Sequence, residues 1–163
     1  MMMLRVLLAL MLLLPAACQA AERPALSENG LALIPLTITT AEGKSHRFTV
    51  EVAATEAQQA RGMMFRATLA PDAGMIFPMS PPRYASFWMK NTVIPLDMIF
   101  VDSTGLVKRV HENAVPGDET PISGGEGILV VLEINAGLAQ ALGIVPGSQM
   151  RHAVFGLDAL WPC

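Results

Sequence analysis

Cysteine is scarce in this chain of 163 residues, which contains two, Cys18 and Cys163. No Cys-x-x-Cys pair occurs, which excludes thioredoxin-like redox chemistry and cysteine-rich zinc sites. Histidine is almost as rare, because His46, His111 and His152 lie far apart and no His-Glu-x-x-His motif is present. The Gly-x-Ser-x-Gly motif of many hydrolases is missing as well. We therefore predict no metal and no cofactor, and the sequence identifies no catalytic residue.

Charged residues are also few, at 15% of the chain, and the net charge is −3 at pH 7. About a quarter is usual in a soluble domain. An acidic chain lacks the positive surface that nucleic-acid binding needs. No run of like charge marks a patch for a membrane surface. We therefore expect no nucleic-acid partner and no membrane contact apart from the N-terminus, and an unknown small ligand or envelope protein remains as the partner.

Long apolar runs are limited to residues 6–14, which follow Arg5. The run is too short for a membrane-spanning helix, which needs about 20 residues, and is typical of a secretory signal peptide. Cys18 follows small residues and resembles the lipidated cysteine of a bacterial lipoprotein box. We predict a signal peptide over 1–17, lipidation of Cys18 and an exported protein, periplasmic or membrane-anchored by lipid. The alternatives are ordinary cleavage, for example after Ala20, which would remove Cys18 with the signal peptide, and an uncleaved anchor. The sequence leaves open whether Cys18 and Cys163 form a disulfide, which lipidation of Cys18 would forbid.

The remainder divides into a flexible tether over 18–30 and a single globular domain over 31–163. Alternating or continuous apolar patterns predict strands over 31–40, 47–52, 86–92, 96–102, 106–112, 128–134 and 149–155. Helices are predicted over 56–61, opened by a Thr55–Gln58 capping box, and over 136–142. The proline- and glycine-rich segment 113–127 is expected to be a loop. This predicts an α+β, β-rich fold: a curled mixed sheet or partly closed barrel of about seven strands with two short helices.

Two carboxylates interrupt strands that are otherwise apolar on both faces, Asp97 in 96–102 and Glu133 in 128–134. An unpaired buried carboxylate costs several kcal/mol, so each is expected to meet a cation or several hydrogen-bond donors. We predict a partly buried cluster walled by Trp88, Phe65 and methionines. The candidate ligand-binding residues are Arg61, Arg66, Trp88, Lys90, Asn91, Asp97 and Glu133, with Thr92 as a further hydrogen-bond partner.

This cluster has more than one interpretation. It is either a set of structural ion pairs or a polar pocket for a small anionic or zwitterionic ligand, since arginine suits carboxylate and phosphate groups. Asp97 and Glu133 could instead act as acid and base in a hydrolase-like enzyme. Thioethers favour Cu(I), and the methionines beyond the signal peptide are Met63, Met64, Met75, Met79, Met89, Met98 and Met150.

Five ordered motifs resemble the domain of unknown function 192 family. They are Arg-Gly-Met-Met-Phe-Arg at 61–66, Gly-Met-Ile-Phe at 74–77, Phe-Trp-Met-Lys-Asn-Thr at 87–92, Pro-Leu-Asp-Met at 95–98 and Val-Leu-Glu-Ile-Asn-Ala-Gly at 131–137. The resemblance implies one compact β-rich domain, often exported or membrane-tethered, with no established reaction. We expect a non-catalytic binding or accessory module of the cell envelope.

Overall fold

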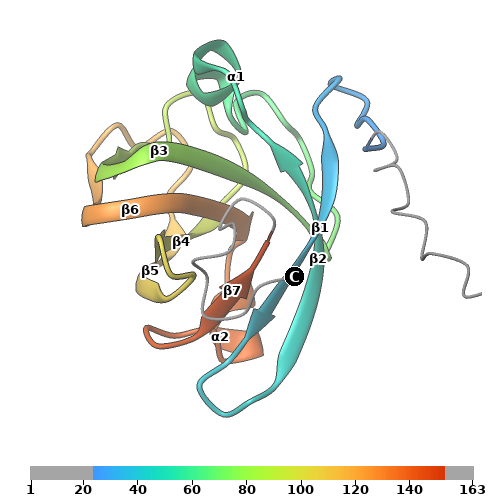
Figure 1. Ribbon diagram of the computed structural model, residues 1–163. Helices are drawn as coiled ribbons and strands as arrows, with labels where there is room; N and C mark the ends of the chain where they lie inside the picture. Colours follow the sequence, from blue (N-terminus) through green and yellow to red (C-terminus); the bar gives the residue numbers. More distant parts are fainter. Residues whose placement is uncertain (1–23, 153–163) are drawn as a thin grey trace, which may run out of the picture.

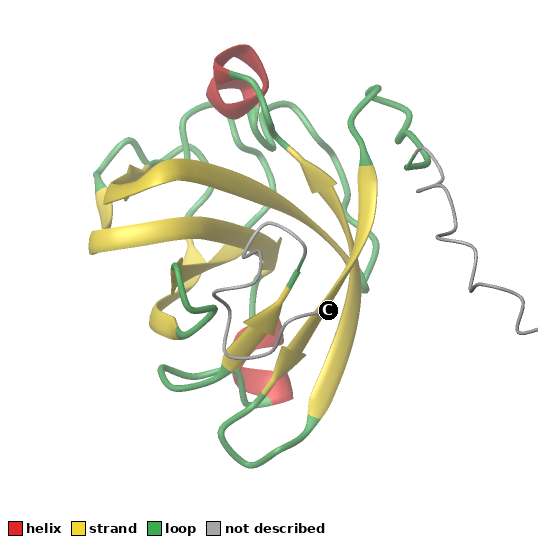
Figure 2. Cartoon of the chain, viewed as in Figure 1, coloured by secondary structure: helices red, strands yellow, loops and turns green. Residues whose placement is uncertain are grey.

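The structure is a computed structural model that describes residues 24–152. It contains one mixed sheet of seven strands and two short helices, which confirms the predicted β-rich α+β fold (Figures 1 and 2). The strands are β1 (Leu33–Thr39), β2 (Ser45–Val52), β3 (Ala73–Phe87), β4 (Leu96–Asp102), β5 (Val107–Ala114), β6 (Ile122–Asn135) and β7 (Gln149–Arg151); the helices are α1 (Glu56–Arg61) and α2 (Leu138–Leu142). The predicted signal peptide, Cys18 and Cys163 lie outside the described residues.

The spatial order of the strands is β5-β4-β6-β3-β2-β1-β7. Neighbouring strands run antiparallel except β2 and β3, which are parallel and are connected through α1. The two edges of the sheet approach each other where Leu106 bridges Gln149 and the Val107 amide donates to the Ser148 carbonyl at 2.9 Å. The sheet is therefore curled into a partly closed barrel, as Figure 1 shows.

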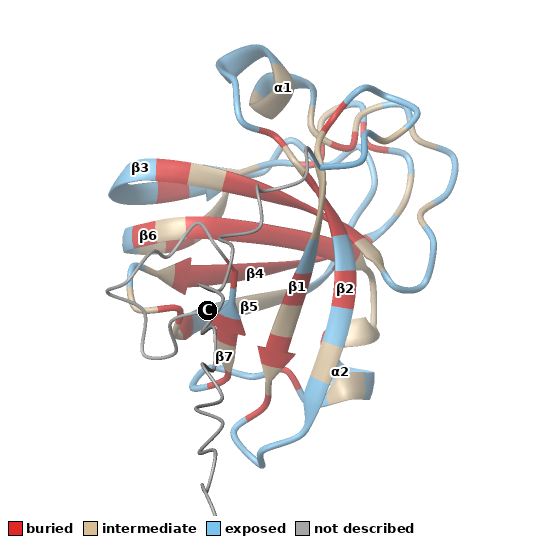
Figure 3. Cartoon of the chain, turned by 45° about the vertical axis from the view of Figure 1, so that its right-hand side comes forward, coloured by how far each residue is buried: buried red, intermediate tan, exposed pale blue. Residues whose placement is uncertain are grey.

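Each face of the curled sheet carries its own hydrophobic cluster. The inner cluster takes side chains from all seven strands and from α2, and it includes Ile76, Ile99 and Leu132. The outer cluster covers β3, β4 and β6 and includes Met75, Met98 and Val131. Because both faces are covered, β4 is buried from Leu96 to Val101, as Figure 3 shows. The sequence prediction that β4 is buried on both sides is thus confirmed.

One strand is missing from the sequence prediction and another is longer than predicted. β3, for which only the last two residues fall in a predicted strand, continues across Pro78 and two further prolines to Phe87, with irregular pairing to β6 between Pro78 and Arg83. β6 begins at Ile122, inside the expected loop, and at Gly124 a Cβ atom would lie 2.0 Å from the Phe100 ring. Glycine is needed there because the ring lies directly against the strand backbone. Conversely, residues 88–92 are not the predicted strand, since β3 ends at Phe87 and a turn follows.

No helix among residues 24–152 is long and apolar enough to cross a membrane.

Candidate functional site

Helix α1 is fixed at both of its ends. The predicted capping box is present: the Thr55 hydroxyl accepts from the Gln58 amide at 3.2 Å, and the Gln58 side chain accepts from the Thr55 amide at 3.0 Å. Gln59 donates to the Pro78 carbonyl of β3 at 2.8 Å, which ties the helix to the sheet. Gly62 ends the helix with φ 45° and ψ −131°, a conformation that residues with a side chain rarely adopt. Arg61 is therefore held at a defined place above β3.

Three segments that we call the rim loops, residues 63–66, 88–92 and 115–118, are joined by backbone hydrogen bonds. The Phe65 amide donates to the Asn91 carbonyl at 2.9 Å, and the Gly117 amide donates to the Met89 carbonyl at 3.1 Å. Phe65 and Asn91 both have positive φ, 63° and 54°. That conformation is unusual for a side chain as bulky as phenylalanine, and such strain is often kept where a site requires it.

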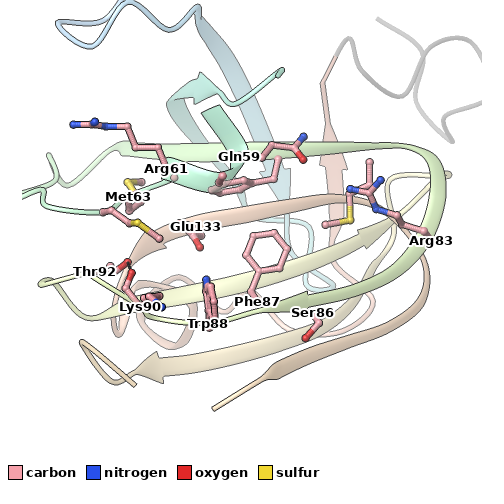
Figure 4. A pocket seen from close by; sticks show the side chains of 15 residues that line it. Gln59, Arg61, Met63, Arg83, Ser86, Phe87, Trp88, Lys90, Thr92 and Glu133 are labelled. Atoms are coloured by element: carbon pink, nitrogen blue, oxygen red, sulfur yellow. Dashed lines mark hydrogen bonds between the residues drawn. The ribbon is translucent and has the colours of Figure 1, made fainter. Parts of the chain in front are cut away.

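A pocket of about 290 Å³ opens between α1, β3 and the rim loops (Figure 4). Its apolar walls are aromatic and methionine side chains, most of them from the outer hydrophobic cluster. Its polar groups include three cationic side chains and one carboxyl group. The residues that line it are Gln59, Ala60, Arg61, Gly62, Met63, Met64, Phe77, Met79, Arg83, Ser86, Phe87, Trp88, Lys90, Thr92 and Glu133. Predicted wall residue Phe65 is not among them, because 64% of its surface is exposed to solvent.

Glu133 is the one acidic side chain that lines this pocket. It lies on β6 between Met75 of β3 and Met98 of β4, its cross-strand neighbours, and is 4% exposed. Within residues 24–152 its carboxyl group has no hydrogen bond and no ion pair. Burial raises the pKa of Glu133 from 4.5 to about 8, an increase that the Arg66 guanidinium partly opposes. Glu133 is therefore mostly neutral at pH 7.

Arg66 is occupied by another buried acid, Glu51 of β2, with which it forms an ion pair. Glu51 is the register partner of Met75, so Glu51, Met75 and Glu133 follow one another across three adjacent strands on the outer face. The sequence pattern places Glu51 on a solvated face, and this is wrong because the segment after α1 covers that side of β2. Arg66 therefore neutralises Glu51 and leaves Glu133 without an ion pair.

Lys90 and Trp88 form the solvent side of the pocket. The Lys90 ammonium lies 5.0 Å from the centre of the Trp88 ring, a cation–π distance, and 3.5 Å from the Glu119 carboxylate. Trp88 is 48% exposed, so one part of the ring lines the pocket while another faces solvent. The Lys90–Glu119 pair is largely exposed and can open at little cost when a stronger anion arrives.

The structure brings only some of the predicted site residues together. Arg61, Trp88, Lys90 and Glu133 line the pocket, and Arg66 acts on Glu133 from one side. The following two residues lie elsewhere. Asn91 is exposed on a rim loop, where its amide donates to the Met64 sulfur at 3.9 Å. Asp97 is outside the pocket altogether.

Asp97 is fully buried, and of the two expected kinds of partner, a cation or several hydrogen-bond donors, the described residues supply only the donors. Its two carboxylate oxygens accept from the backbone amides of Asn113 in β5 and Ala139 in α2, both at 2.8 Å. Asn113 lies at a register irregularity between β4 and β5 and has φ 55°. Asp97 therefore fixes that irregularity and the first turn of α2, which is a structural role.

Register also separates the two carboxylates that the enzyme alternative combines. Met98 is the partner of Glu133 on β6, and Asp97 is the partner of Ile134. Because adjacent residues of a strand point to opposite faces, the Asp97 side chain lies on the inner face and that of Glu133 on the outer face. The two groups cannot act together on one substrate.

Residues that the sequence did not single out also line the site, notably Arg83 and Gln59. Arg83 follows two prolines in a segment expected to be irregular, so no periodic pattern could assign it to a face. Gln59 belongs to a helix with no buried residue, and only its contact with β3 distinguishes it. Across residues 24–152, no group of three or more His, Cys, Asp or Glu side chains is arranged to hold a metal ion.

Two solved structures resemble this chain. A protein of unknown function from Novosphingobium aromaticivorans DSM 12444 is 49% identical with a TM-score of 0.76, and the match covers 81% of this chain and 94% of that protein. A protein from Sinorhizobium meliloti 1021, described as a candidate transcription regulator, is 42% identical with a TM-score of 0.74, over 76% of this chain and 96% of that protein. No match was found among curated proteins.

The family model of DUF192, described as "Uncharacterized ACR", matches residues 37–152. The match includes the five motifs, α1, the rim loops and the pocket, and it agrees with the resemblance found in the sequence. The chain belongs to the DUF192 family, the domain of unknown function 192.

Proposed function

We propose that this protein is a non-catalytic binding module of the cell envelope that holds a small anionic or zwitterionic ligand in the pocket beside α1. The observation that carries the proposal is the charge imbalance of the pocket. Arg61, Arg83 and Lys90 line it as cations, whereas its single acidic residue, Glu133, is mostly neutral at pH 7 because its pKa is about 8. An anion entering the pocket is therefore attracted by its walls.

Two of these cations have no acidic partner that an incoming anion would have to displace. Within the described part of the chain, neither Arg61 nor Arg83 has a carboxylate within 4 Å. An arginine fork binds carboxylate or phosphate through two parallel hydrogen bonds. Figure 4 shows Arg61 and Arg83 at opposite ends of the cavity, with the guanidinium of Arg61 pointing away from Glu133. The full chain is acidic, at −3, so this local excess of positive charge is not a general property of the protein.

The apolar walls indicate what else the ligand contains. Met63, Met79, Phe77 and Phe87 line the pocket beside the polar groups. Unbranched thioether side chains adapt to differently shaped apolar groups. A small acid with an aliphatic or thioether body fits this lining, and a bare inorganic anion would leave the walls without contacts. Selectivity would then depend on the charged end of the ligand more than on its body.

Export is the second part of the proposal, and the N-terminal sequence supports it. Residues 6–14 have the length of a signal-peptide core, and Cys18 stands where a lipoprotein is cleaved and lipidated. Mass spectrometry of the mature protein distinguishes a diacylglyceryl Cys18 from a chain that begins near Ala21. A protein that retains residues 1–17 in its native host would overturn the export proposal.

Native mass spectrometry of the protein purified from its own envelope tests the binding proposal. We expect a retained small ligand that is lost from a double variant, Arg61→Gln with Lys90→Gln. The matched control is Lys108→Gln with Arg109→Gln, two exposed cations on β5 away from α1, which should keep the ligand. If the wild-type protein carries no ligand and binds no small carboxylate or phosphate in titrations up to millimolar concentration, the proposal is wrong.

Copper handling remains a second candidate because Met63, Met64 and Met79 all line the pocket. Thioethers are soft ligands that select Cu(I). Under reducing conditions, anaerobic titration with Cu(I) would then give a one-to-one complex in the native mass spectrum. Met79→Leu keeps the volume and removes a thioether, so the complex should weaken in this variant. Equal Cu(I) binding by the variant and the wild type would exclude this site.

A further inference from the structure

Glu133 raises a question that anion binding alone does not answer. A carboxyl group on the central part of the sheet, 4% exposed, lines the pocket without a hydrogen-bond partner among residues 24–152. A buried polar group without a partner is costly, and most buried polar groups are paired. A simple hydrophobic residue would serve an anion-binding pocket equally well. The carboxyl group therefore points to a partner that comes from outside the chain.

The charges around Glu133 define the partner. Glu51 and Arg66 form an ion pair and cancel each other. Glu133 is then either neutral and unpartnered or negative and in need of a cation. Arg61, Arg83 and Lys90 line the same pocket, but none of them lies within ion-pair distance of the Glu133 carboxylate. A cationic group on the ligand would satisfy the carboxylate and would favour its ionised form.

A ligand with only a positive charge is disfavoured, because it would have to pass three cations that line the pocket. A ligand with only a negative charge would contact those cations and leave Glu133 unpartnered. A zwitterion satisfies both ends at once: its ammonium group binds the buried carboxylate, and its carboxylate binds the cations nearer to solvent. Figure 4 shows Glu133 on β6, with Lys90 and Trp88 below it in this view.

We propose that the pocket is a receptor for a small amino acid-like zwitterion, with the ligand ammonium on Glu133 and the ligand carboxylate on Lys90 or the neighbouring arginines. This deepens the proposed function and rests on it. The apolar body of such a ligand would lie against Met63, Phe77 and Phe87, which line the space between the two charged ends. The order of charges, ammonium inside and carboxylate outside, is the specific content of the inference.

Proton release is the distinguishing signal of this arrangement. Free protein at pH 7 carries a mostly neutral Glu133, since its pKa is about 8. Binding of an ammonium group ionises the carboxyl, so about one proton leaves for each ligand bound. Isothermal titration calorimetry at pH 7 in imidazole and in Tris measures this, because the two buffers take up the released proton with different enthalpies and neither is an anion that would compete for the cations of the pocket.

The titrations use L-leucine and 6-aminohexanoate as zwitterions, with hexanoate and hexylamine as compounds that carry one of the two charges. We expect at least one zwitterion to bind about tenfold or more tightly than either single-charge compound and to release a proton. Glu133→Gln should abolish proton release and remove the preference of the protein for the zwitterion over hexanoate. Glu119→Gln, which alters an exposed carboxylate near the same cavity, should leave proton release intact.

Each result decides between the two proposals. If hexanoate binds as tightly as both zwitterions, the inference is wrong and the anion-binding function stands. If hexylamine binds as tightly as both zwitterions, the carboxylate contact is absent and both fail. If the zwitterions bind to Glu133→Gln with the same affinity and the same proton release as to the wild type, the ligand ammonium does not bind Glu133 and the inference is overturned. If none of the four compounds binds, the inference fails, and the retained-ligand experiment separately decides the proposed function.

Discussion

Replacing Glu133 with glutamine should change how the stability of the protein depends on pH. The carboxyl group has a pKa of about 8 in the folded protein, against 4.5 for an ordinary glutamate, because burial penalises its charged form. Between these two values the folded state binds a proton that the unfolded state has lost. Stability from this group is therefore fully present below pH 4.5 and is lost as the pH rises through about 8.

The size of the effect follows from the width of that interval. The free energy of unfolding falls by about 1.4 kcal/mol for each pH unit in which the folded state alone keeps the proton. Over the interval from 4.5 to about 8 the loss approaches about 5 kcal/mol. That is a large part of the stability of a typical domain, about 5–15 kcal/mol. Glutamine has nearly the same shape and does not titrate, so Glu133→Gln should be similar to the wild type at pH 5 and more stable at pH 8.

Urea unfolding at pH 5, 6, 7 and 8 measures the prediction. The difference in free energy of unfolding between variant and wild type cancels the other titrating groups, and it should increase by about 4 kcal/mol across this range. Glu119→Gln is the control, because it makes the same change of side chain at a carboxylate that is more than half exposed and not buried in the sheet. A flat difference for Glu133→Gln would mean that this carboxyl group is hydrated in solution, and the argument from burial would be refuted.

Three further substitutions test how the site is held in place. Asp97→Ala removes the acceptor of two buried backbone amides and should destabilise the protein by about 2–4 kcal/mol in thermal unfolding; an unchanged melting temperature would contradict its structural role. Gly62→Ala introduces a Cβ atom 3.3 Å from an aromatic ring at positive φ, so a loss of more than about 1 kcal/mol is expected, and equal stability would remove the argument for a glycine cap. Arg66→Met leaves Glu51 buried without its ion-pair partner and should cost about 3–5 kcal/mol at pH 7, a cost that Glu51→Gln in the same chain should partly relieve.

Local patterns in the sequence predict several elements at residue precision. The capping box of Thr55 and Gln58 and the stop at Gly62 give α1 over the predicted residues, since the groups involved are at most a few positions apart. β4 is recognised because an apolar run without alternation indicates a strand covered on both faces. These predictions succeed because each depends on contacts that the local chain itself determines.

The lengths of β3 and β6 depend on contacts between distant residues. Prolines from Pro78 on and glycines near Gly124 are typical breakers of strands. Local reasoning therefore predicts no strand before residue 86 in the β3 region and begins the later strand only at Ile128. In the folded protein the ring of Phe100, from β4, occupies the space that a side chain at position 124 would fill. Gly124 is therefore required by a neighbour that the sequence pattern alone does not reveal, and β6 continues through this segment.

Prediction of the site residues from the sequence is limited in the same way, because their partners are distant along the chain. Asp97 and Glu133 look equivalent in sequence, because each is a carboxylate with apolar residues on both sides of it in a strand segment. The partners that distinguish them are remote: the amides that bind Asp97 lie 16 and 42 positions further along the chain. Their opposite faces follow from the register between β4 and β6, which no local pattern specifies. The sequence therefore predicts that both are buried but does not predict which one faces the pocket.

Three carboxylates are buried in this sheet, and the cost of burying the charged group is offset differently for each of them. Asp97 accepts hydrogen bonds from two backbone amides, and Glu51 pairs with the Arg66 guanidinium. Both solutions use groups of the chain itself, and both acids are thereby fixed in structural roles. Glu133 has neither amides nor a cation of its own and avoids the cost of burial by keeping its proton. A buried carboxyl group that lines a cavity and has no partner in the described residues has the property expected of a binding residue. This difference, more than the presence of a pocket, is the reason why we propose Glu133 as the centre of the site.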